Sequence, residues 1–176
     1  MPVATTGANV VDGVIVFTDL VGFTEFTALR GDAAALALLA LQERLVTAAL
    51  PRGARIVKEL GDGLLLFFPD SASAVRTGLT LQEAFEEQAA ATGWPLWVRM
   101  GMHAGHALQR GVDLVGHDVN VAARIVDVAG PGEVLVSDSA RAEVRCGLEL
   151  VCFEELGPVV MKGIPEPIRL WRATCA

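Results

Sequence analysis

The segment at residues 55–68 constrains the fold of this 176-residue chain more than any other. It holds two strand-like runs, 55–60 and 64–68, joined only by Gly61-Asp62-Gly63. Strands joined by so short a turn pair antiparallel as a hairpin. The preceding segment, 25–50, is rich in alanine and leucine, which is typical of helix, and Gly31-Asp32 interrupts it. The fold therefore combines a hairpin with helical connections.

Strand-like and helix-like segments alternate along the rest of the chain as well. We expect a strand at 13–19, a helix at 71–91, a pair of strands at 96–103 and 107–109, a helix at 118–128, a strand at 133–136 and extended structure up to 171. Because helical connections and hairpins are mixed, the sheet should hold parallel and antiparallel pairs. This order predicts an α+β, ferredoxin-like (βαββαβ-type) mixed sheet with helices on one face.

Composition limits the class of protein. Hydrophobic residues make up 52% of the chain and charged residues 20%, which is enough apolar material for one core, so we expect a single domain over 1–176. The net charge of −7 lacks the basic footprint of a nucleic-acid binder. No apolar run is long enough to cross a membrane, and the first residues do not resemble a signal peptide, so we expect a cytoplasmic protein without a membrane partner.

Three cysteines, Cys146, Cys152 and Cys175, show no CxxC spacing. An odd number of unpaired cysteines favours reduced thiols over a disulfide framework or a zinc site. We expect them to be small buried hydrophobic residues.

Two aspartates lie at the ends of expected strands. Asp19 follows the apolar run 14–17, and Asp62 lies in the hairpin turn. Mg²⁺ is commonly held by one or two carboxylates and completes its coordination with substrate phosphates, so the pair indicates chemistry on a nucleotide. Asp62 has a second interpretation, because an Asp-Gly pair also suits a tight type I′ turn without any metal.

Other polar residues have both a structural and a functional interpretation. With a side-chain period of two, Lys58 shares a face of its strand with Ile56 and Leu60, where its ammonium either reaches solvent or meets a ligand. Asn120 and Arg124 are four residues apart on a helix, either as an exposed polar stripe or as two groups that reach one ligand. Lys162 lies in a Gly/Pro-rich turn typical of a solvated loop.

Together these segments resemble the class III adenylate/guanylate cyclase catalytic domain. The resemblance rests on residues 17–24, on Lys58 with Gly61-Asp62-Gly63, on 101–105, on 113–124 and on 162–167, in this order and at this spacing. It extends over residues 12–172 and implies the class III nucleotidyl cyclase fold. Each segment alone is a weak signal, but their combination is specific.

The resemblance implies a metal site. Asp19, Asp62 and the backbone carbonyl of Leu20 would hold two divalent ions, Mg²⁺ or Mn²⁺. Two such ions suit phosphoryl transfer, since one activates the attacking hydroxyl and the other neutralises the leaving phosphates.

The resemblance also implies how the nucleotide is bound. Lys58 and Asp113 would select adenine, because Lys58 donates to N1 and Asp113 accepts from N6, whereas guanine presents the opposite pattern. Asn120 would orient the ribose, Arg124 would stabilise the transition state and Lys162 would bind the triphosphate. The implied activity is that of an adenylate cyclase, which forms 3′,5′-cyclic AMP and pyrophosphate from ATP.

The family further implies a head-to-tail homodimer whose two sites each combine residues from both chains. Two alternatives within the family stay open, a guanylate cyclase and a non-catalytic nucleotide-binding module. A diguanylate cyclase would share the layered fold, but it should carry a Gly-Gly-acidic-acidic signature that Gly61-Asp62-Gly63 does not supply. His106, His117 and Asp118 depart from the residues usual in the family, and His103 is expected to belong to the scaffold and not to act as a catalytic base.

Overall fold

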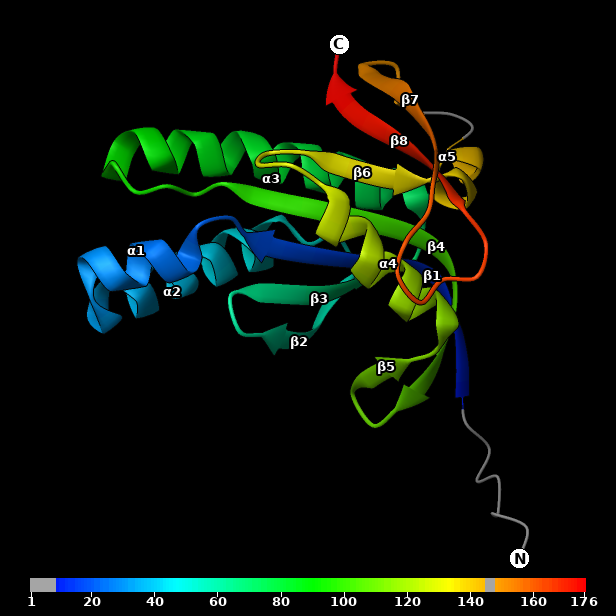
Figure 1. Cartoon of the computed structure of the whole chain (residues 1–176), viewed down its shortest axis with the longest axis horizontal. Coiled ribbons are helices and arrows are strands. Elements are labelled where there is room, and N and C mark those ends of the chain that lie inside the picture. Colours follow the sequence, from blue (N-terminus) through cyan, green and yellow to red (C-terminus); the bar gives the residue numbers. More distant parts are fainter. Residues whose placement is uncertain (1–8, 145–147) are drawn as a thin grey trace, which may run out of the picture.

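The structure, a computed structural model, describes residues 9–144 and 148–176. The elements in chain order are β1 (Asn9–Leu20), α1 (Phe23–Arg30), α2 (Asp32–Ala49), β2 (Arg55–Leu60), β3 (Gly63–Phe68), α3 (Ser71–Thr92), β4 (Val98–Arg110), β5 (Asp113–Val115), α4 (His117–Val128), β6 (Val134–Ser137), α5 (Asp138–Glu143), β7 (Val151–Val159) and β8 (Ile168–Cys175) (Figure 1).

One mixed sheet organises these elements. Its strand order is β2-β3-β1-β4-β6-β8-β7, and β5 pairs with β4 to form a hairpin that projects from the body of the molecule (Figure 1). The pair β4–β6 is parallel, and the other neighbouring strands are antiparallel. The predicted α+β fold with a mixed sheet is therefore confirmed.

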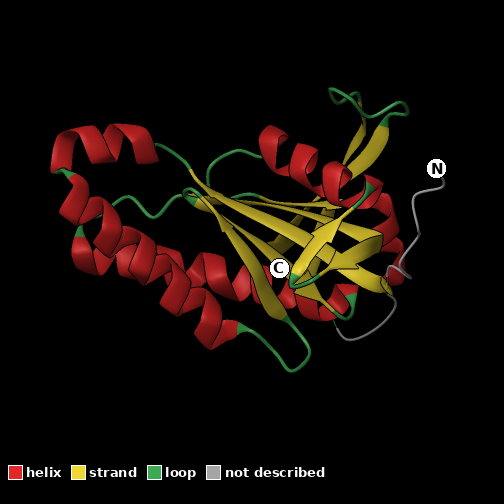
Figure 2. Ribbon diagram, turned by 90° about the horizontal axis from the view of Figure 1, so that it is seen from below, coloured by secondary structure: helices red, strands yellow, loops and turns green. Residues whose placement is uncertain are grey.

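Helices cover both faces of the sheet (Figure 2). One face packs with α2, α3 and α5 in the larger apolar core, which includes Val14 and Val16 of β1. The alternate residues of β1, Ile15 and Phe17, point to the other face and pack against α4. The expectation of helices on one face was thus wrong for α4, which the sequence signal could not assign to a side. We call the side covered by α4 the α4 face.

Helix α4 lies unusually close to the sheet. A Cβ atom added at Gly101 of β4 would lie 2.4 Å from the backbone nitrogen of Val126. Glycine is thus the only residue that fits at position 101 without displacing the helix. This contact sets the distance between α4 and the sheet.

Most predicted elements are present, but the short strand β5 was not predicted, and β4 and the C-terminal part also differ from the expectation. Gly31, at φ 85°, separates α1 from α2 as expected. The strands expected at 96–103 and 107–109 are one strand, β4, because β1 pairs with it from Leu20–Val98 to Asn9–Gln109. The C-terminal part contains α5 and the β7–β8 hairpin, where only extended chain was expected.

The cysteines were predicted wrongly where the structure describes them. Cys152 and Cys175 are exposed and not buried. Cys146 lies outside the described residues. None of the helices within 9–144 and 148–176 combines the length and the apolar character needed to cross a membrane.

Candidate functional site

Asp19 and Asp62 lie next to each other at one end of the sheet. Asp19 is the second-last residue of β1, and Asp62 lies in the turn between β2 and β3. Partial burial raises the pKa of Asp62, and the nearby charge of Asp19 raises it further. A carboxylate whose charge is disfavoured in this way by a neighbouring carboxylate belongs to a centre that a hard cation would stabilise.

A close backbone approach brings the two aspartates together. A Cβ atom added at Gly63 would lie 2.4 Å from the backbone oxygen of Thr18, so any side chain there would push β3 away from β1. The turn itself has Gly61 at φ 66°, whereas Asp62 does not have a positive φ. This pattern is that of a type II′ turn, with glycine first, and differs from the type I′ turn that an Asp-Gly pair suggests.

Leu20, the predicted carbonyl ligand, follows Asp19 and is the last residue of β1. Within the described residues, no group of three or more His, Cys, Asp or Glu side chains is arranged to bind a metal. Two carboxylates and one carbonyl nevertheless match the needs of Mg²⁺, which usually keeps several positions for water and substrate phosphates. The donors present therefore fit a divalent cation.

Arg99 is a member of this site that the sequence analysis missed. Its Nε and Nη2 atoms lie 2.8 and 2.6 Å from Oδ2 of Asp19. Its Nη1 atom donates to the backbone oxygen of Asp127 at the end of α4, at 3.1 Å. Arg99 is the direct cross-strand partner of Asp19, so the register of β1 with β4 would have revealed the pair.

Lys58 and Asp113 form an ion pair although they are 55 residues apart. The Nζ atom of Lys58 lies 2.8 Å from both carboxylate oxygens of Asp113. The hydrogen bond from Lys58 is the main reason that the pKa of Asp113 is lowered. The two residues predicted to read the purine are therefore in contact.

A β-bulge in β2 makes this contact possible. Ile56 pairs with Leu66, but Lys58 pairs with Leu65, so Val57 is an extra residue in the strand. Leu66 belongs to the larger core, whereas Leu65 packs on the α4 face. The expectation that Lys58 shares a face with Ile56 was therefore wrong, since a regular period of two holds only without a bulge.

Arg55 holds the β4–β5 hairpin to β2 as well. Its Nη1 atom donates to the backbone oxygen of Val112 at the hairpin tip, at 3.0 Å. Its guanidinium also lies 5.7 Å from the centre of the Phe67 ring. Together with the Lys58 ion pair, this contact fixes the hairpin that carries Asp113.

Asn120, Arg124 and Lys162 form a second group. Asn120 and Arg124 are exposed residues of α4, and Nη1 of Arg124 donates to Oδ2 of Asp127 at 2.8 Å. Lys162 is exposed in the β7–β8 connection, whose residues Met161 and Ile164 pack in the same apolar cluster as α4.

Within one chain the two groups are linked indirectly, through Arg99 and Asp127. Among the described residues, no hydrogen bond or ion pair connects Asp19 or Asp62 with Asn120, Arg124 or Lys162. The chain thus presents a pair of neighbouring aspartates, a Lys–Asp ion pair and a separate set of polar and basic groups, whose side chains are chemically suited to a cation, a base, and ribose and phosphate.

Comparison with known sequences identifies relatives along almost the whole chain. Residues 8–172 match the family described as adenylate and guanylate cyclase catalytic domain. The pH-sensitive adenylate cyclase of Mycobacterium tuberculosis is 36% identical over 163 residues, which cover 90% of this chain and 39% of that protein. An adenylate cyclase of Streptomyces coelicolor is 33% identical over 128 residues, covering 72% and 32% of the two chains. The chain thus spans less than half the length of these two relatives.

Solved structures share the fold. The adenylyl cyclase CyaB from P. aeruginosa matches with a TM-score of 0.83 at 23% identity, over 96% of each chain. The guanylate cyclase domain of RhGC from Catenaria anguillulae, in complex with GTP, also gives a TM-score of 0.83 at 23% identity, over 96% of this chain and 99% of that chain.

Proposed function

The chain belongs to the adenylate and guanylate cyclase catalytic domain family, and we propose that it converts ATP into 3′,5′-cyclic AMP and pyrophosphate. In this reaction the ribose 3′-hydroxyl attacks the α-phosphorus in line, and pyrophosphate leaves. Relatives named adenylate cyclase support ATP as the substrate. The residues that read the base provide the main structural support.

The Lys58–Asp113 pair is the observation that carries the proposal. Adenine offers an amino group at N6 beside an acceptor at N1. Asp113 can accept from the amino group while Lys58 donates to N1, and the pair is already assembled by the bulge and by Arg55. Guanine offers an acceptor at O6 beside a donor at N1, which would leave both protein groups unpaired.

Asp19 and Asp62, with the backbone carbonyl of Leu20, would hold divalent cations. Such ions would lower the pKa of the 3′-hydroxyl and neutralise the leaving pyrophosphate. Arg99 balances the charge of Asp19 in the structure, so the site is held together by an internal cation from β4.

Asn120, Arg124 and Lys162 would act on the sugar and the phosphates. The Asn120 amide can both donate to and accept from ribose hydroxyls. Arg124 is suited to the charge that develops on the α-phosphoryl oxygens, and removing one such donor typically costs about 3 kcal/mol of transition-state stabilisation. Lys162 supplies a point charge for the triphosphate.

We further propose that two copies of the chain pair head to tail, so that each site takes its cation-binding aspartates from one chain and its nucleotide-reading groups from the other. Exposed apolar residues support a contact surface at the β4–β5 hairpin and the adjoining start of β1, namely Val10, Leu108, Val112 and Val115. Apolar side chains gathered in this way are typical of interaction surfaces.

The test is a product assay. Purified protein is incubated with Mg²⁺ or Mn²⁺ and either ATP or GTP, and cyclic nucleotide and pyrophosphate are quantified. We expect cyclic AMP with an equal amount of pyrophosphate, little product from GTP, and loss of activity in the Asp19→Asn variant.

Other outcomes would select the alternatives. Preferential formation of cyclic GMP would identify a guanylate cyclase. Measurable ATP binding by a folded dimer, without cyclic product from either nucleotide, would identify a non-catalytic nucleotide-binding module.

A further inference from the structure

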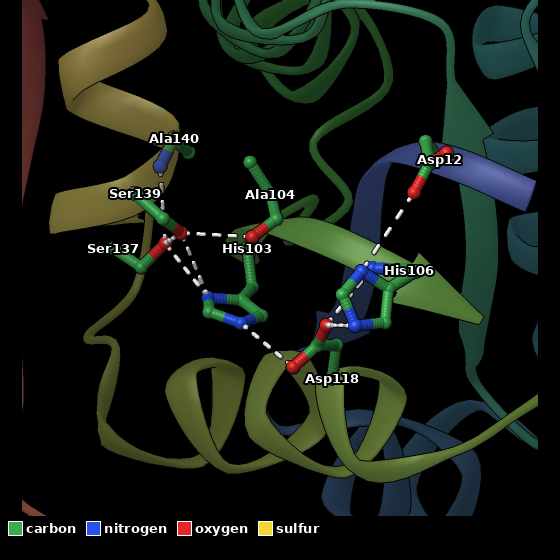
Figure 3. A network of polar contacts seen from close by, with 8 residues as sticks. All are labelled: Asp12, His103, Ala104, His106, Asp118, Ser137, Ser139 and Ala140. Atoms are coloured by element: carbon green, nitrogen blue, oxygen red, sulfur yellow. Dashed lines mark hydrogen bonds and ion pairs between the residues drawn. The ribbon is translucent and has the colours of Figure 1, made fainter.

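Asp118 connects the start of α4 to β4 (Figure 3). Its Oδ2 atom accepts a hydrogen bond from the backbone N–H of His106 at 2.8 Å, and its Oδ1 atom lies 3.4 Å from Nε2 of His103. Only 17% of the side chain is exposed. Asp118 therefore points toward the strand and away from solvent.

Strand β4 leaves space for this carboxylate because residue 105 is a glycine. A Cβ atom added at Gly105 would lie 2.1 Å from Oδ2 of Asp118, so any other residue at 105 would expel it. Gly116, which precedes α4, provides no side-chain cap for the helix. Asp118 thus gives the first turn of α4 a polar contact to the sheet, and a negative charge there also suits the helix dipole.

His103 extends the connection to a third element. Its Nδ1 atom lies 2.9 Å from Oγ of Ser137, the residue that caps α5, and Oγ of Ser139 donates to the backbone oxygen of Ala104 (Figure 3). Burial lowers the pKa of His103, and the charge of Asp118 offsets this only in part. A neutral imidazole with its proton on Nε2 donates to Asp118 and accepts from Ser137, so both contacts are satisfied.

Helix α4 thus contacts β4 at two points along its length. Near its end, Val126 rests on Gly101, and in its first turn Asp118 is bonded to β4. Asn120 and Arg124 lie between these two contacts. Both side chains are exposed, and Asp127, the acceptor for Arg124, is itself on α4, so the placement of α4 sets where these side chains lie.

We propose that Asp118 is a positioning residue that aligns Asn120 and Arg124 for the cyclisation. The inference rests on the proposed function, and it assigns Asp118 no contact with the nucleotide. Small errors in the placement of catalytic groups reduce rates strongly, so loss of the contact should lower kcat. The KM for ATP should change less, because Lys58 and Asp113 bind the base from other elements.

The experiment compares Asp118→Ala with the conservative variant Asp118→Asn. In Asp118→Ala we expect kcat to fall about tenfold or more, with KM changed less than about threefold. The contact does not require an anion, because the amide oxygen introduced by Asp118→Asn can still accept from the N–H of His106. The NH₂ group of the same amide can donate to His103 after a change of tautomer. Asp118→Asn should therefore keep kcat within about threefold of the wild type.

Asp12→Asn is the matched control. Asp12 also approaches this network, with Oδ1 at 3.7 Å from Nδ1 of His106, but its side chain is 85% exposed. We expect no change in its kcat. Thermal unfolding of each variant shows whether the protein is folded at the assay temperature.

Amide hydrogen exchange gives a readout that does not depend on activity. The His106 amide should exchange faster in Asp118→Ala than in the wild type, while amides in the centre of β1 keep their protection. If that exchange rate is unchanged, or if it rises while kcat stays within about twofold, the positioning role is wrong. A wild-type protein that forms no cyclic nucleotide would instead overturn the proposed function, and the exchange data would then report on the contact alone.

Discussion

At the scale of single residues, Asp62 is a proposed cation ligand whose ionised carboxylate also lowers the stability of the fold. Its pKa is raised by burial and by Asp19, so the folded state binds its proton more tightly than the unfolded chain does. The resulting stability is present at low pH and is lost as the pH rises through the folded pKa. At neutral pH the ionised carboxylate therefore lowers stability, and a bound cation would remove this cost.

The Asp62→Asn variant should be more stable than the wild type at pH 7 in the presence of a chelator. We expect a gain below about 1 kcal/mol, because the carboxylates are partly exposed and water screens their repulsion. Urea denaturation measures the difference. Mn²⁺ should stabilise the wild type but not the variant, and equal stabilisation of both would place the cation elsewhere.

His103 predicts an acid-dependent loss of stability. Because burial lowers its folded pKa, the unfolded chain takes up a proton more readily than the folded protein once the pH drops below about 6.5. The free energy of unfolding should fall from that pH downward, until the folded form is also protonated. Urea denaturation between pH 5 and 7.5 should show a smaller dependence on pH for His103→Gln than for the wild type.

Swapping the charges of Lys58 and Asp113, which we propose read the base, should change substrate choice. The double variant Lys58→Glu with Asp113→Lys keeps an ion pair of opposite orientation, so a carboxylate faces the N1 donor of guanine and an ammonium faces O6. We expect the ratio of kcat/KM for ATP to that for GTP to fall by on the order of tenfold or more. An unchanged ratio would show that the pair does not contact the base.

At the scale of elements, the packing of α4 on β4 depends on Gly101. The Gly101→Ala variant places a methyl group against the backbone of Val126, where no side chain can move aside. Overpacking of this kind typically costs about 1–3 kcal/mol. Chemical denaturation should show this loss, and the cyclase rate should fall because α4 carries Asn120 and Arg124.

The sequence predicted elements that local chemistry determines. The hairpin at 55–68 and the break at Gly31 depend on glycine and on strand or helix preference within a few residues, and both are present. The bulge at Val57 and the continuity of β4 depend on partner strands far away in the sequence, so local patterns did not reveal them. Helix α5 has only six residues, so its capping residue Ser137, Asp138 in its first turn and Arg141 in its last turn were too short a pattern to predict it.

In the candidate site too, some residues could be predicted from the sequence, whereas others depend on contacts between distant segments. The resemblance named the residues that the family motifs contain, and the structure brings Asp19 to Asp62 and Lys58 to Asp113. Arg99, Arg55 and Asp118 were missed, because their contacts arise from strand register and from helix packing.

At the scale of the whole molecule, the proposed head-to-tail dimer predicts complementation between inactive variants. Asp62→Ala removes a proposed cation ligand, and Arg124→Ala removes a proposed transition-state contact, so each homodimer should be nearly inactive. After mixing under conditions of subunit exchange, half of the dimers should be mixed, and each of these keeps one site with all its residues. Activity should recover to about a quarter of the wild-type value at equal mixing. If labelled subunits demonstrably exchange and no activity returns, the head-to-tail arrangement is wrong.

The two outermost strands of the sheet both depart from regular pairing. β2 does so at Val57 and β7 at Leu156, and β7 also contains Pro158, which has no N–H to donate. A long regular outer strand offers its open hydrogen-bonding groups to strands of other molecules, which is how fibrils and other sheet aggregates begin. The extra residue that turns Lys58 toward Asp113 therefore also makes β2 a poor template for aggregation.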